Sequence, residues 1–201
     1  SDVATVAAMY AAFFDEVVRA TELNFRAVGW TGAEAAVLCE ALPRFQALTS
    51  LDVSENRELG DEGVSAICQT LQSHEEIPLA SLNVSRNGID LEGAKAVAAV
   101  AASLTMVRWP PAHEPMPCLH SALACSMRPA LADYQRHAFS RLQLDLSNNL
   151  LGPEGAKALA PALVRSSLTK LDARHNWNLG DEGKAALQEA TEGRSGFELM
   201  L

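Results

Sequence analysis

Residues 48–56 read LTSLDVSEN, with an apolar residue at the first, fourth and sixth places and asparagine at the ninth. The same pattern returns at residues 79–87 (LASLNVSRN) and at residues 168–176 (LTKLDARHN). Residues 141–149 and 20–28 are weaker copies, because arginine takes the first apolar place in the former and valine takes the asparagine place in the latter. The chain is therefore built from repeats, which are the primary signal for its fold.

The middle leucine of each copy measures the period of the repeat. These reference leucines are Leu23, Leu51, Leu82, Leu144 and Leu171. They follow one another at a nearly constant interval, except that the step from Leu82 to Leu144 is twice the step from Leu51 to Leu82. We therefore predict a further repeat in the middle, with a strand at residues 104–109 and Val107 at the reference position. A last strand is expected in residues 197–201, where Leu199 follows Leu171 by one repeat length.

A second pattern lies between the predicted strands and indicates helices. In residues 154–163 (EGAKALAPAL) the apolar positions follow the spacing i, i+3, i+4 and i+7 and are Ala156, Leu159, Ala160 and Leu163. Each such segment has an acidic residue in its first turn, where the helix dipole favours negative charge: Glu62, Glu92, Glu154 and Glu182. Each unit is thus predicted to run strand, loop, helix.

Two segments carry a resemblance to a known family. Residues 51–71 (LDVSENRELGDEGVSAICQTL) and 146–163 (LSNNLLGPEGAKALAPAL) resemble ribonuclease-inhibitor-like leucine-rich repeats, and the likeness extends over most of residues 20–201. The terminal GRSGFELML is similar to short leucine-rich-repeat proteins of algae and other protists. The resemblance implies an α/β fold: a horseshoe segment of solenoid with about six repeats, a parallel β-sheet on the concave face and helices on the convex face.

We predict a single domain, residues 1–201. Its parts are an N-terminal capping helix (1–19), three repeats (20–103), a degenerate repeat with a proline-rich insertion (104–140), two repeats (141–196) and a terminal strand cap (197–201). The insertion contains PPAHEPMPC, whose four prolines exclude a helix or a central strand. We expect His113, Met116 and His120 in it to contact a partner, although a tolerated loop without a role is the alternative.

Composition narrows the class of partner. The 201 residues carry a formal net charge of −9, which disfavours non-specific binding to nucleic acid, and no apolar stretch is long enough to span a membrane. Four scattered cysteines indicate a reducing compartment rather than a disulfide scaffold. We expect a cytoplasmic protein, or an organellar one if a targeting segment has been removed before Ser1.

The sequence predicts no catalytic, cofactor or metal site. His113, Cys118, His120 and Cys125 are spaced differently from the paired ligands of a structural zinc site. Cys39 and Cys68 occupy equivalent helix positions and are expected to be core thiols. No nucleophile motif or glycine-rich phosphate loop is present.

What remains is the surface of the sheet. Side chains of a strand alternate between its two faces, so the residues flanking the inner leucines should project from the concave face. With the adjoining loops they give the candidate partner-binding residues Arg26, Asp52, Glu55, Asn83, Arg86, Arg108, Asp145, Lys170, Asp172, Arg174, His175 and Trp177. Arginine and tryptophan are typical anchors of protein interfaces. The alternative is a solvated strand face without a partner. Trp30 and Trp109 fall at core positions.

We therefore expect a non-catalytic protein-binding module, an adaptor, scaffold or inhibitor that acts through the concave face. The alternative is a structural accessory subunit, held in a large and sometimes organellar multiprotein complex through its insertion and end caps. The resemblance also suggests a GTPase-activating regulator, which ranks third because the chain has fewer repeats than such proteins and no acidic C-terminal tail.

Overall fold

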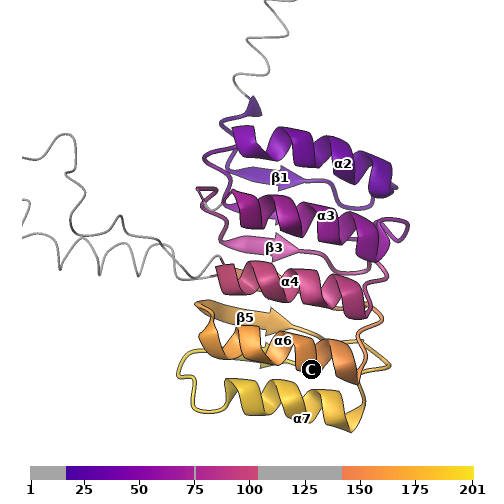
Figure 1. The fold of residues 1–201 in the computed structure, drawn as a ribbon, viewed down its shortest axis with the longest axis vertical. Helices are drawn as coiled ribbons and strands as arrows, with labels where there is room; N and C mark the ends of the chain where they lie inside the picture. Colours follow the sequence, from indigo (N-terminus) through magenta and orange to yellow (C-terminus); the bar gives the residue numbers. More distant parts are fainter. Residues whose placement is uncertain (1–16, 75, 104–141) are drawn as a thin grey trace, which may run out of the picture.

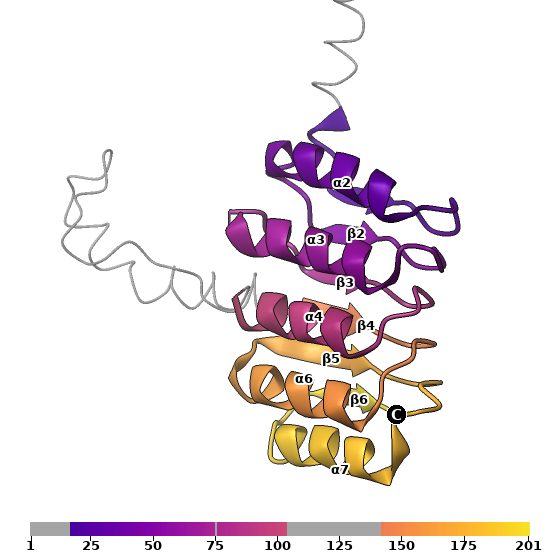
Figure 2. The same ribbon diagram turned by 45° about the vertical axis from the view of Figure 1, so that its right-hand side comes forward.

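A computed structural model describes residues 17–74, 76–103 and 142–201, which stack into an open solenoid with a parallel sheet on one side and helices on the other (Figures 1 and 2). The described strands are β1 (Glu22–Asn24), β2 (Ser50–Asp52), β3 (Ser81–Asn83), β4 (Leu142–Asp145), β5 (Leu168–Asp172) and β6 (Glu198–Met200). The described helices are α2 (Gly32–Ala41), the 3₁₀ turn η1 (Leu42–Arg44), α3 (Gly60–Ser73), α4 (Leu91–Ser103), α6 (Pro153–Arg165) and α7 (Gly180–Thr191).

The sheet has the order β1-β2-β3-β4-β5-β6, and every pair is parallel. Its register places the reference leucines in a single row across all six strands: Leu23, Leu51, Leu82, Leu144, Leu171 and Leu199. The four inner members of this row are at most 3% exposed, since the helices cover them. The predicted leucine-rich-repeat solenoid is confirmed.

One predicted strand, residues 104–109, lies outside the described residues. Residues 104–109 were expected to form a strand between those of Leu82 and Leu144, yet β3 pairs directly with β4 and Leu82 lies opposite Leu144. Backbone hydrogen bonds from Gln143 to Ala80 (2.9 Å) and from Val84 to Asp145 (3.0 Å) flank this pairing. These bonds use the edge of β3 that an intervening strand would need. The described sheet therefore has no strand between β3 and β4, and the degenerate repeat expected at residues 104–140 stays a prediction.

Several predicted residues lie outside the described part of the chain. They are Arg108, Trp109, His113, Met116 and His120, together with the cysteines at 118 and 125 and the first sixteen residues of the capping helix. Val17 and Val18 are described, and both pack partly buried against the core. Trp30 also packs there and stacks on Phe25 with 4.3 Å between the ring centroids.

The consensus asparagines form a buried ladder along the strand-to-helix loops. Asn149 accepts the backbone N–H groups of Asn87 (3.0 Å) and Ile89 (3.1 Å) and donates to the carbonyls of Val84 and Leu146. Asn56 and Asn176 make equivalent bonds in their own units. Because buried backbone groups are costly when unpaired, each asparagine links its own loop to that of the neighbouring unit.

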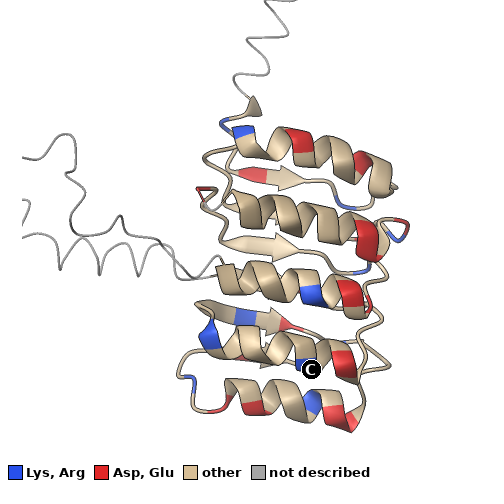
Figure 3. Ribbon diagram, in the orientation of Figure 1, with Lys and Arg blue, Asp and Glu red and all other residues tan. Residues whose placement is uncertain are grey.

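The helices carry acidic residues in their first turns, as predicted, and because the helices stack in parallel these residues line one side of the solenoid, at the right in Figure 3. Lys157 on α6 ties two helices together by binding Glu182 of α7 (2.7 Å) and Glu154 of its own helix (2.9 Å). The hydrogen bond to Glu182, followed by that to Glu154, raises the pKa of Lys157.

Arg194 fastens the last unit to the one before it. Its guanidinium donates to the carbonyl oxygens of Leu163, Ser166 (2.8 Å) and Leu168 (2.7 Å), which follow one another around the end of α6. The same group lies 4.6 Å from the ring centroid of Phe197. Partial burial lowers the pKa of Arg194, although it remains charged at neutral pH. Nothing in the repeat pattern predicts this contact.

Candidate functional site

The candidate residues occupy two adjoining regions of the described structure. The sheet face consists of the strand side chains that point away from the helices, among them Asp52, Asn83, Asp145, Lys170 and Asp172. The rim consists of the loops that follow the carboxyl ends of the strands, and it carries Arg26, Glu55, Arg57, Arg86, Arg174, His175 and Trp177. Alternation within each strand places the sheet face on the side that the sequence predicted.

One row of the sheet face has a structural role within the loops. Asp52, Asn83, Asp145 and Asp172 lie opposite one another in the register of β2 to β5. Each side chain accepts the backbone N–H two residues further on, at distances of 2.8–3.1 Å. These bonds turn the chain out of the strand, as Asp and Asn commonly do. A contribution of this row to partner binding therefore stays a prediction.

Three rim residues from successive units form an ion-pair cluster. The carboxylate of Glu55 accepts Nη2 of Arg26 (3.0 Å) and Nη1 of Arg86 (2.6 Å), both at the same oxygen, Oε1. The hydrogen bond from Arg26 and the two positive charges lower the pKa of Glu55. These residues are 29 and 31 positions apart in the sequence, and the solenoid brings them together because the spacing is close to one repeat.

The backbone at the rim explains where these side chains point. The residue at the same place in each unit has a positive φ angle. The angles are 62° for Glu55, 58° for Arg86 and 59° for His175, and Ala27 and Asn148 also have positive φ. This left-handed conformation is uncommon for residues other than glycine. Backbone bonds hold it in place, with Glu55 donating to Ser85 (2.9 Å) and Arg86 to Ser147 (3.1 Å). The residue before each consensus asparagine is thus aimed outward from the rim.

A second cluster lies further along the sheet. Arg174 donates from Nη2 to Oδ2 of Asp172 at 2.6 Å, and its Nε binds the same carboxylate. Partial burial raises the pKa of Asp172, but the hydrogen bonds and charge of Arg174 outweigh burial and hold it below its usual range. On the neighbouring strand Glu198 pairs with Lys170 (3.3 Å). No contact joins this cluster to Glu55 within the described residues.

The two repeat units that contain LGDEG have one more residue in the loop than the units with Gly93 and Gly155. The longer loop forms a hydrogen-bonded turn in both units. The backbone N–H of Leu59 donates to the carbonyl of Asn56 (2.9 Å), and that of Leu179 donates to the carbonyl of Asn176 (3.0 Å). Gly60 and Gly180 then adopt positive φ to begin the helix. Arg57 and Trp177 stand at the same exposed position of these turns.

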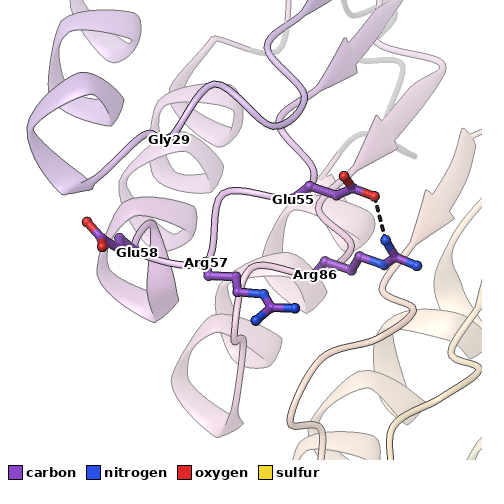
Figure 4. A pocket seen from close by; sticks show the side chains of 5 residues that line it. All are labelled: Gly29, Glu55, Arg57, Glu58 and Arg86. Carbon is purple, nitrogen blue, oxygen red and sulfur yellow. Dashed lines mark hydrogen bonds and ion pairs between the residues drawn. The ribbon is translucent and has the colours of Figure 1, made fainter.

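Each of these turns borders a surface hollow. One has a volume of about 350 Å³ and is lined by Gly29, Glu55, Arg57, Glu58 and Arg86 (Figure 4). The other, of about 260 Å³, is bordered by His175, Trp177, Leu179 and Leu201 among others. Trp177 is 87% exposed, and its ring centroid lies 6.1 Å from that of His175. The sequence singled out Trp177, but Arg57 was missed even though the extra residue marks both positions.

The remaining candidate groups are the metal-ligating side chains and the cysteines of the described residues. Among residues 17–74, 76–103 and 142–201, no three His, Cys, Asp or Glu side chains gather where they could hold a metal ion. Cys39 and Cys68 are free thiols. Burial, followed by the neighbouring Cys39, raises the pKa of Cys68 to about 12, so this thiol stays protonated and packs in the core.

Comparison with known proteins agrees with this geometry. Residues 46–68, 78–98 and 142–160 match a family model described as Leucine Rich repeat. Three stretches of the chain are thus similar to leucine-rich repeats. The matches coincide with β2 and α3, β3 and α4, and β4 and α6, in each case reaching into the helix. Leucine-rich repeats generally mediate protein–protein interactions and are typically not enzymes.

A curated relative is similar over part of the repeat array. Protein CARMIL of Dictyostelium discoideum is 32% identical over 119 residues, which is 56% of this chain and 11% of that protein. The chain thus spans about a tenth of the length of this relative. In the described residues, no helix is both long and apolar enough to cross a membrane.

Proposed function

We propose that this protein is a non-catalytic, ribonuclease-inhibitor-like repeat module that binds another protein through the sheet face and the rim. It acts as an adaptor, scaffold or inhibitor and needs no cofactor. The near-constant interval between the reference leucines, with a full α-helix between successive strands, supports the subtype. Cytoplasmic location, with an organelle as the alternative, stays a prediction.

The observation that carries this proposal is the exposed Trp177 beside His175 and the Asp172–Arg174 pair. A tryptophan with 87% of its surface exposed has no role in the stability of the described core. Arginine and tryptophan supply much of the binding energy at protein interfaces. Because the sheet and the asparagine ladder hold these groups at fixed spacing, binding would cost little ordering entropy.

Crosslinking mass spectrometry in the native extract tests the proposal, because the lysines sample both sides of the solenoid. Lys170 lies on the sheet face, whereas Lys95 and Lys157 lie on helices. We expect partner crosslinks at Lys170, and we expect the double variant Arg174→Glu, Trp177→Ala to lose them. Arg165→Glu on α6 is the control. Crosslinks that concentrate at Lys95 and Lys157 would refute binding through the sheet face.

A second candidate function is that of a structural subunit held in a larger assembly by the insertion. The direct pairing of β3 with β4 favours it, because the described sheet is continuous from the third unit to the fourth without a strand from the insertion between them. His113, Met116 and His120 would then be contact residues. Deleting residues 110–136 should abolish partner capture under this proposal and leave it unchanged under the first. No observation on the described residues favours a GTPase-activating role.

A further inference from the structure

One rim arginine, Arg57, is available to bind a partner from outside the described structure. Within the described residues, Arg57 has no hydrogen-bond or ion-pair partner, whereas Arg26 and Arg86 share a single carboxylate oxygen of Glu55. A guanidinium is donor-only and carries several N–H groups in a fixed plane. Most donors of these three side chains are therefore available to an acceptor from outside.

The hollow beside Arg57 gives such an acceptor a place. Its volume is about 350 Å³, and Arg57 and Arg86 both extend to the same side of it, whereas Glu58 points in the opposite direction (Figure 4). Gly29 contributes no side chain, and a Cβ there would meet nothing within 4 Å. The hollow thus stays open beside Arg57, and Glu55 already holds Arg86 in place at 2.6 Å.

The charge of this spot differs in sign from that of the whole chain. The local charge is +1, whereas the chain carries −9. It is the sum over three arginines and two glutamates: Arg26, Arg57, Arg86, Glu55 and Glu58. A single carboxylate would balance this excess. An extended phosphate polyanion would instead meet Glu58 and the acidic first turn of α3, with Asp61 and Glu62.

We propose that this hollow docks a short acidic segment of a partner protein, whose carboxylate binds Arg57 and is flanked by Arg86. Arginine suits this task because its planar fork binds carboxylate at two points. The inference deepens the proposed protein-binding function and rests on it, since it names the chemistry that the rim recognises. The docking point lies at the loops after β1 to β3, away from the Trp177 cluster after β5.

Nuclear magnetic resonance of arginine side chains tests this directly. The full chain is titrated with the peptide acetyl-GSDEDSG-amide and, as a control, with acetyl-GSNQNSG-amide. We expect the acidic peptide alone to shift the Nε–Hε signals of Arg57 and Arg86. The variant Arg57→Gln should weaken its binding about ten-fold, and Arg57→Lys should restore part of the loss. Arg165→Gln, which removes the same charge from an exposed site on α6, should change nothing.

Three outcomes would overturn the inference: equal shifts with the neutral peptide, binding that Arg57→Gln leaves intact, or tighter binding of hexathymidylate than of the acidic peptide. Arg57 occupies an exposed turn position, so the backbone spectrum should show that the variants fold. If the acidic peptide does not bind while crosslinking of the native partner still depends on Arg174 and Trp177, only this inference is refuted. If no partner crosslinks form on the sheet face, the proposed function is refuted.

Discussion

Leu82 lies directly opposite Leu144 in neighbouring parallel strands, although two repeat lengths separate them in the sequence. The two side chains are 2% and 3% exposed, so the core runs without interruption from the third unit to the fourth. The helices continue likewise, since a Cβ placed on Gly155 of α6 would lie 3.4 Å from that of Ala94 on α4. The insertion between these units is therefore not needed to complete the stack.

Deletion of residues 110–136 tests this continuity. It shortens the connection between Ser103 and Leu142 from about 38 residues to about 11, which lowers the entropic cost of closure by about 1 kcal/mol. We expect the free energy of unfolding, measured with urea, to be equal to that of the intact chain or slightly higher. A loss of more than about 2 kcal/mol, or a second unfolding transition, would mean that the insertion is part of the core.

The asparagine ladder should contribute strongly to stability. Asn149→Ala removes the acceptor of the buried N–H groups of Asn87 and Ile89 and the Asn149 donor to the carbonyl of Val84, and it should cost about 3 kcal/mol of unfolding free energy. The carbonyl of Leu146 keeps its second donor, Asn176. Asn178→Ala, at an exposed turn position, is the matched control and should stay within about 0.5 kcal/mol. Chemical denaturation of both variants provides the comparison. Equal costs at the two positions would contradict the ladder.

The Asp172–Arg174 pair should make stability depend on pH in the acidic range. Because the pKa of Asp172 is lower in the folded state than in the unfolded chain, its contribution is present above the unfolded pKa of about 4 and is lost as pH falls through the folded pKa. Asp172→Asn should therefore cost about 1 kcal/mol at pH 7, a figure reduced for the solvent around Arg174. The cost should vanish at the acidic end of the titration.

Thermal unfolding of wild type and Asp172→Asn at several pH values between 7 and 2.5 measures this difference. Glu189→Gln, which removes an exposed carboxylate on α7, is the control for net charge. A gap between wild type and Asp172→Asn that stays constant across the whole range would exclude the pair as its cause.

Arg194 should hold the last unit in place. Arg194→Ala removes donors from three carbonyl groups at the end of α6 and should cost about 2 kcal/mol. Lysine has a single point charge and should recover less than half of the loss. Hydrogen exchange should show the effect mainly in α7 and β6. Protection that falls uniformly through all units would instead indicate a global role for this residue.

The sequence determined the repeat, the buried leucines and the loop asparagines, because each depends on a short stretch of chain. Alternation within a strand buries Leu51 while its neighbours face outward, and the same rule applies in every copy. The sheet face could thus be listed residue by residue, and Asp52, Asn83 and Asp145 do lie on it. That these three side chains cap their own loops was not visible, because the bond depends on the backbone turn after the strand.

Only the tertiary structure decided which strands are neighbours and which charges meet. The doubled interval between Leu82 and Leu144 predicted a strand at residues 104–109. An insertion of one repeat length gives the same interval as an additional repeat, so the sequence does not distinguish the two. Arg26, Glu55 and Arg86 meet at one carboxylate oxygen because left-handed backbone at the last two residues aims them outward at adjoining turns of the solenoid. Local side-chain patterns specify what each unit buries, whereas strand pairing and ion pairs depend on contacts between units that are distant in the chain.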